Sequence, residues 1–247
     1  MLVVYLALAV MAGAIAQRVS GMGFALVVAP VLIVLIGPFD GVLMVNLCGA
    51  VSSCLVITRV WRHIDWKQYA LLVVPALLAI IPGTLVSVLI GGPALQIVVG
   101  SILLVALTIS LLVTRSDLIV PRGPAGILSG ATSGFMSATA GTGGPGVSIY
   151  SVLTRWEHRQ FAATIQPFFV TLGTVSFTSK VFASDGGLPE YDWWLWGVVI
   201  GSTVIGLVLG EYLARVVSSH IARFAVIGVS YLGGGVIVTD GVMALAY

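Results

Sequence analysis

The sequence predicts an all-α integral membrane protein built from two inverted-topology repeats of about five helical segments each. Three observations lead to this prediction: the composition, the length of the apolar runs and the placement of the charges. Of 247 residues, 59% are hydrophobic and only 8% are charged, against about 25% charged residues in a soluble domain. The runs suit bilayer-spanning helices of about 20 residues and lack the alternation of a transmembrane β-barrel. We therefore expect one compact transmembrane domain whose surroundings are the lipid bilayer.

Ten apolar runs follow one another along the chain, separated by charged residues or by glycine and proline. The first run, LVVYLALAVMAGAIAQ, resembles a signal peptide but has no positive leader, and another run follows at once, so we expect it to be retained as a helix. The net charge of +2 is too small to indicate a nucleic-acid partner. The runs fall at about 2–17, 22–37, 41–61, 68–90, 94–114, 123–138, 144–154, 159–183, 191–214 and 219–240.

The ten runs divide into two halves, residues 1–120 and 121–247, that we interpret as repeats. Gly21-Met22-Gly23 matches Gly141-Thr142-Gly143 at an offset of 120 residues, and the same offset relates Asn46 to Gln166. The runs that follow each glycine pair also agree in order and approximate length.

Charge placement predicts the orientation of the two halves. The connections at 59–67, 115–122 and 155–159 and the one that begins at Arg215 are basic, and the positive-inside rule assigns them to the cytoplasm. The halves then have opposite topology, an arrangement found in secondary transporters. Both termini are expected on the non-cytoplasmic side of the plasma (inner) membrane.

Two glycine-rich stretches, 20–23 and 137–146, are predicted to be the tips of broken or re-entrant membrane hairpins. Each arm has about 15 residues, or roughly 22 Å at 1.5 Å per residue, which is less than the hydrocarbon thickness of about 30 Å. The tips should therefore meet near the bilayer midplane. A helix that starts at each tip presents unpaired N–H groups and the positive end of its macrodipole. Such a site binds an anion without a cationic side chain.

The predicted substrate-binding residues are the tip glycines with their neighbours, neutral hydrogen-bonding side chains and one arginine. In the alternative interpretation the glycines serve only tight turns and helix packing, as in GATSG (130–134), GVVIG (197–201) and GLVLG (206–210). Arg18 could equally extend to the interface, and Lys180 is expected to anchor the end of its helix there. The predicted set is Arg18, Ser20, Gly21, Met22, Gly23, Asn46, Thr139, Gly141, Thr142, Gly143, Gly144 and Gln166.

No motif for an intramembrane enzyme, such as HExxH, CxxC or a serine–histidine pair, is present in the sequence. We therefore expect no catalytic residue, no metal site and no cofactor.

The segments GMGFALVVAP (21–30) and SGFMSATAGTGGPG (133–146), together with the repeat arrangement, resemble the TauE/SafE family of sulfite and organosulfonate exporters over nearly the whole chain. The resemblance implies a secondary transporter that exports small sulfur-containing anions such as sulfite or sulfoacetate by alternating access around the paired tips. The chain departs from the family where Phe24-Ala25 follow Gly23, since members often carry a denser glycine cluster there.

Two other functions stay open, an anion channel of the same architecture and a non-transporting membrane scaffold. The coupling ion (proton or sodium) and the oligomeric state are open as well.

Overall fold

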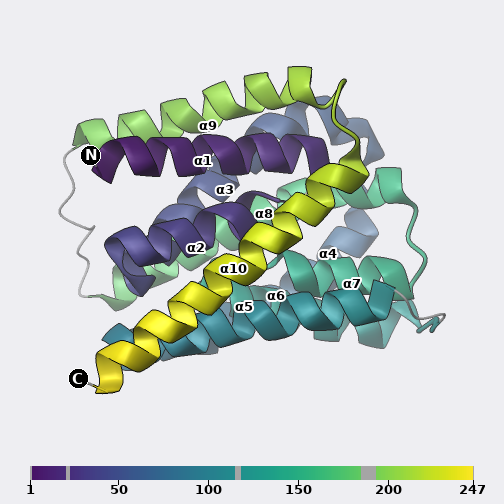
Figure 1. The fold of residues 1–247 in the computed structure, drawn as a ribbon. Coiled ribbons are helices and arrows are strands. Elements are labelled where there is room, and N and C mark those ends of the chain that lie inside the picture. The colour runs from purple at the N-terminus through teal and green to yellow at the C-terminus, as the bar shows by residue number, and fades with distance from the viewer. Residues whose placement is uncertain (1, 21–22, 115–117, 185–192, 247) are drawn as a thin grey trace.

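The computed structural model describes residues 2–20, 23–114, 118–184 and 193–246, and in these ranges it consists of helices joined by short turns, with no strand (Figure 1). Among them, seven helices are long and apolar enough to cross a membrane: α1, α3, α4, α5, α8, α9 and α10. The helices are α1 (Leu2–Ser20), α2 (Phe24–Ile36), α3 (Pro38–Val60), α4 (Trp66–Leu89), α5 (Gly92–Thr114), α6 (Arg122–Ala140), α7 (Gly144–Leu153), α8 (His158–Ala183), α9 (Trp193–Leu213) and α10 (Ser219–Ala246), with a 3-10 turn, η1 (Trp61–His63), after α3.

The arms of the two predicted hairpins are unequal. The helices α1 and α6 have 19 residues each, or about 28 Å, whereas α2 has 13 residues and α7 has 10. The prediction of about 15 residues per arm is therefore wrong for α1 and α6, which are longer, and for α7, which is shorter. At the ends of these helices, Ser20 and Thr139 donate their hydroxyl hydrogens to carbonyl oxygens one turn earlier, those of Ala16 and Phe135. Both hydroxyl groups thus have their hydrogen-bond acceptor within their own helix.

Four helix pairs make the main long-range contacts: α1 with α9, α4 with α6, α5 with α10 and α3 with α8. In Figure 1, α10 crosses the bundle diagonally, and the N- and C-termini lie at the same end of the molecule. These pairs are symmetric between the first five helices and the last five. If α1 corresponds to α6, α2 to α7 and so on to α5 and α10, the pair of α1 with α9 corresponds to the pair of α6 with α4. The pairs of α5 with α10 and of α3 with α8 each correspond to themselves.

Glycines let two of these pairs approach closely. An added Cβ at Gly206 would lie 2.6 Å from the carbonyl oxygen of Met11, and one at Gly210 would lie 2.8 Å from Cβ of Arg18. Gly130 and Gly134 face the backbone of α4 in the same way, whereas Gly197 has no atom within 4 Å. Two of the three small-residue patterns therefore pack helices together, which in a bilayer gains van der Waals contact.

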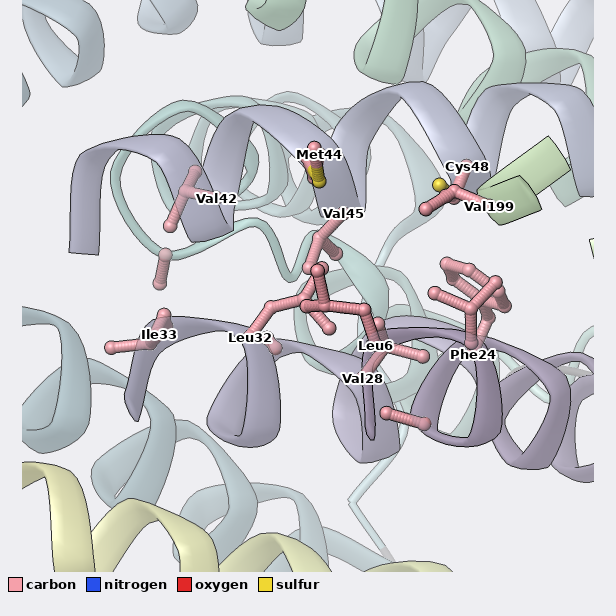
Figure 2. Close-up of a cluster of buried hydrophobic side chains, with 14 of the residues drawn as sticks. Leu6, Phe24, Val28, Leu32, Ile33, Val42, Met44, Val45, Cys48 and Val199 are labelled. Atoms are coloured by element: carbon pink, nitrogen blue, oxygen red, sulfur yellow. The ribbon is translucent and has the colours of Figure 1, made fainter. Parts of the chain in front are cut away.

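Apolar packing fixes the start of α2 against α3. Val28, Leu32 and Ile33 of α2 are fully buried against α3, and Figure 2 shows Val45 pointing from α3 toward α2. Phe24, the first residue of α2, belongs to the same cluster as Cys48 of α3. A second cluster, centred on α4, α7 and α8, holds α7. The start of each short helix is thus positioned by buried side chains.

Candidate functional site

A cavity of about 50 Å³ lies where the starts of α2 and α7 meet the middle of α3 and α8. A single water needs only about 10–15 Å³ on the same measure, so the cavity has room for a small cluster of waters or one small polyatomic ion. None of the described residues that line it is charged. They are Gln17, Phe24, Ala25, Leu26, Val45, Asn46, Gly49, Ser53, Ser137, Gly141, Thr142, Gly143, Gly144, Phe169, Leu172 and Gly173.

The second hairpin reaches the cavity through the turn between α6 and α7. Gly141 adopts a left-handed conformation (φ 70°) at the end of α6, which glycine adopts without steric cost. The backbone N–H groups of Gly141 and Thr142 donate to the carbonyl oxygens of Ser137 and Met136. Since these two N–H groups cap α6, an anion would have to bind the amides that follow, from Gly143 onward.

The start of α7 lies beside the middle of α6. A Cβ added to Gly143 would be 2.9 Å from the carbonyl oxygen of Ser133, and Ser133 is about 16 Å from the start of a helix about 28 Å long. The helix start has no side-chain cap, since Gly143 occupies the N-cap position. Its positive end therefore faces the cavity uncompensated by a side chain.

The first hairpin supplies a second uncapped helix start. Gly23 is the N-cap of α2 and provides no side-chain hydrogen bond. The next three residues, Phe24, Ala25 and Leu26, line the cavity, and N–H groups at these positions have no acceptor within their own helix. Two helix N-termini thus converge on one uncharged space, the arrangement that favours an anion.

Neutral polar side chains complete the lining. Asn46 donates from Nδ2 to the carbonyl oxygen of Ser137 and accepts from the Ser137 hydroxyl, both at 3.0 Å. Gln17 accepts from Ser52 and donates to Ser53. In the described part of the chain, the buried Thr142 hydroxyl has no hydrogen-bond partner. A buried hydroxyl without a partner is costly, so this group is available to a bound ligand.

The structure brings together five of the twelve predicted site residues: Asn46, Gly141, Thr142, Gly143 and Gly144 line the cavity. Gly21 and Met22 lie outside the described residues. Five others lie outside the lining, namely Arg18, Ser20, Gly23, Thr139 and Gln166.

Four of those five residues have partners away from the cavity, and one of them is Ser20, which donates to Ala16 within α1. Arg18 forms an ion pair with Glu211, at 2.6 Å between Nη2 and Oε2, and Arg59 pairs with the same oxygen at 2.7 Å. Gln166 donates to the carbonyl oxygen of Ala162 in its own helix. Thr139 likewise bonds within α6.

Sequence reasoning missed the polar and small residues that line the cavity from the long helices. On α3, Gly49 and Ser53 follow Asn46 at spacings of three and seven residues, which places all three on one helical face. This stripe of small and polar residues inside an apolar run was the signal available in the sequence. Gln17 and Ser137 are the other polar residues that were missed.

Lys180 is fully buried, and its Nζ has no hydrogen-bond partner within the described residues. The expectation that it anchors α8 at the surface is therefore wrong. The Phe39 ring covers the ammonium, with 4.7 Å from Nζ to the ring centroid. The reason is that Lys180 lies on the same buried face of α8 as Gly173 and Ser176, which packs on α3, although Phe182 nearby is 82% exposed.

Seven membrane-length helices in the described chain, three of which line an uncharged cavity, define a multi-pass helical membrane protein. The comparison with protein families then identifies it further. The family model described as Sulfite exporter TauE/SafE matches residues 5–237, so the chain belongs to the TauE/SafE family of membrane transporters. In the two other comparisons, with curated proteins and with solved structures, nothing matches the chain.

Proposed function

We propose that the protein is a secondary transporter that exports a small sulfur-containing anion, held in the cavity between the starts of α2 and α7. The observation that carries the proposal is the convergence of two uncapped helix starts on a space without charged side chains. Helix starts stabilise negative charge, and family membership supports a sulfur anion as the substrate.

The helix packing supports two inverted repeats that alternate access around this cavity. The contact of α1 with α9 in one half corresponds to the contact of α6 with α4 when the first five helices are matched in order with the last five. A two-fold relation between residues 1–120 and 121–247 accounts for this correspondence. In transporters built this way, one repeat rocks against the other around a site near the midplane. The position of Gly143 beside the middle of α6 agrees with such a depth.

The size of the cavity favours the smaller members of the substrate class. About 50 Å³ corresponds to a few waters, so a sulfite-sized anion fits, whereas an organosulfonate such as sulfoacetate requires the cavity to widen. We therefore place sulfite first among the substrates.

Filling the cavity without disturbing the backbone tests the proposal. At Gly49 an added Cβ meets only the Phe24 ring, at 3.7 Å, and at Gly197 it meets nothing within 4 Å. Gly49→Leu should therefore fold and block the cavity, while Gly197→Leu is the matched control on an exposed helix face. Both changes replace a helical glycine, which by itself is neutral or stabilising.

The measurements are thermal unfolding of the purified protein and sulfite flux in proteoliposomes, with sulfite, sulfoacetate, sulfate and chloride as the panel. A ligand at 100 times its Kd stabilises the folded state by about 2.7 kcal/mol. We expect sulfite to raise the Tm of the wild type and of Gly197→Leu but not that of Gly49→Leu, and flux to follow the same pattern. Flux that saturates with concentration supports a transporter, and flux that rises linearly supports a channel. Normal flux in Gly49→Leu would overturn the site.

A further inference from the structure

Lys180 is the one buried side chain in the described part of the chain that carries a formal positive charge and has no hydrogen-bond partner for it. Burying an ammonium group without hydrogen bonds is costly, and an ionisable group inside a membrane segment is by default functional. Neither the cavity nor the ion-pair cluster of Arg18, Arg59 and Glu211 uses this lysine.

The lysine and the ion-pair cluster lie at opposite ends of α3. The Lys180 ammonium lies over Phe39 in the first turn of α3, and Arg59 is in its last turn. The cavity-lining residues of α3 run from Val45 to Ser53, between these ends. Phe39 precedes Asn46 by seven residues. Measured along the axis of α3, Lys180 therefore lies about 10 Å from Asn46.

Polar side chains connect this level with the cavity. Ser176, one turn before Lys180 on α8, donates its hydroxyl hydrogen to Oγ of Ser137 at 3.3 Å. Ser137 lines the cavity and is bonded to Asn46. The sequence of groups from the cavity toward the first turn of α3 is therefore Ser137, Ser176 and Lys180. In addition, the negative charge of the Asp40 carboxylate attracts the Lys180 ammonium group.

We propose that Lys180 is a second anion-binding station, which takes the anion between the cavity and the face of the protein where α3 begins. This inference rests on the proposed function, because it requires an anion that passes through the cavity. When the helices rearrange, the anion exchanges the amides at the starts of α2 and α7 for the ammonium group. The Phe39 ring then leaves the ammonium, and the anion takes its place. A charged station at one end makes the two ends of the path different, whereas the direction of net flux follows the anion gradient and any coupling ion.

The variant Lys180→Met tests the station, because methionine keeps the length of the stem and removes the charge. Replacing a buried charge with an apolar side chain of similar shape is often neutral or stabilising, so we expect an unchanged or higher Tm. Sulfite flux in proteoliposomes should fall at least tenfold, while the sulfite affinity of the cavity, measured by thermal shift, stays within twofold of the wild type. Lys67→Met, which changes the chain's other lysine at the exposed start of α4, is the control and should change neither quantity.

A second variant covers the case in which Lys180→Met does not fold. Phe39→Leu keeps the ammonium group and removes the ring that covers it. We expect the apparent KM for sulfite flux to fall severalfold, because the station then binds the anion more strongly. An unchanged KM would overturn the station.

The remaining outcomes separate this inference from the proposed function. Flux within twofold of the wild type in Lys180→Met overturns the station and leaves the cavity site intact. Equal loss of flux and of affinity also overturns it, because Lys180 would then belong to the cavity or to the folded framework. If the wild type binds and carries no anion of the panel, both proposals fall together.

Discussion

The two hairpins of the protein present the same backbone feature to the cavity but different side chains. The second hairpin, α6 with α7, brings Gly141 to Gly144 and the unpartnered Thr142 hydroxyl. The first hairpin, α1 with α2, brings the apolar side chains Phe24, Ala25 and Leu26, and its polar residue Gln17 already bonds to Ser52 and Ser53. Under the proposed function, both helix starts would stabilise the negative charge of the anion, and we expect side-chain hydrogen bonds to it mainly from the second hairpin.

The tip glycines differ in how much substitution they tolerate, and this gives the largest expected effect. A Cβ at Gly143 meets backbone at 2.9 Å, the Ser133 carbonyl oxygen, whereas a Cβ at Gly23 meets the Ser20 side chain at 2.9 Å and backbone only at 3.2 Å, the carbonyl carbon of Ala16. We expect Gly143→Ala to lower the free energy of unfolding by about 2–3 kcal/mol, in the range of overpacking, and to abolish sulfite binding. Thermal unfolding with and without sulfite measures both.

The corresponding change in the first hairpin is the comparison variant. We expect Gly23→Ala to cost about half as much stability as Gly143→Ala, within the same range of overpacking, and to retain sulfite binding. Equal effects of the two substitutions would show that the hairpins contribute equally and would remove the asymmetry.

Breaking the link between α3 and the second hairpin has the next largest effect. Asn46 makes two hydrogen bonds to Ser137, and pairs of this kind inside membranes contribute about 0.6 kcal/mol on average, and at most about 1.7. We expect Asn46→Leu to destabilise the protein by about 1–2 kcal/mol and to weaken sulfite binding. A double-mutant cycle with Ser137→Ala isolates the pair, and a coupling energy of zero would contradict the link.

The fold could be predicted from the sequence further than the site. Nine of the ten apolar runs agree with helices of the described chain to within three residues at each end, and α10 extends six residues beyond its predicted end, because length and hydrophobicity are local properties of a membrane helix. The cavity lining depends on which faces of α3 and α8 meet. A Cβ at Gly173 would lie 2.5 Å from the carbonyl oxygen of Asn46, and no local pattern gives that crossing.

The same reason accounts for the placement of the two carboxamides. Asn46 and Gln166 match in sequence at an offset of 120 residues, yet only Asn46 lines the cavity. An offset relates positions in the chain, whereas the direction of a side chain follows from the rotation of each helix. The burial of Lys180 could not be predicted from the sequence for the same reason, because it depends on packing between α8 and α3, which belong to different halves of the chain.

Removing the Thr142 hydroxyl should weaken binding without weakening the fold. The hydroxyl is buried and has no partner among the described residues, so Thr142→Val, which keeps the shape, loses no hydrogen bond in the empty protein. A hydrogen bond to a charged group contributes about 1.5–3 kcal/mol, and we expect the Kd for sulfite to rise at least tenfold. Isothermal titration calorimetry measures the Kd, and an unchanged value would mean that the ligand does not use the second hairpin's side chain.

The smallest effect is expected at Gln166, and it tests whether the cavity or the sequence repeat defines the site. Gln166 lies outside the lining, its Nε2 donates to Ala162 of the same helix, and its buried Oε1 has no partner in the described chain. Gln166→Leu therefore removes a buried polar group that is only half satisfied, so stability should stay equal or rise. Sulfite affinity should change by less than about 0.5 kcal/mol, as for a substitution away from a site. If the affinity instead falls as far as in Asn46→Leu, the anion contacts both repeats symmetrically, and the site extends along α8 beyond the cavity described above.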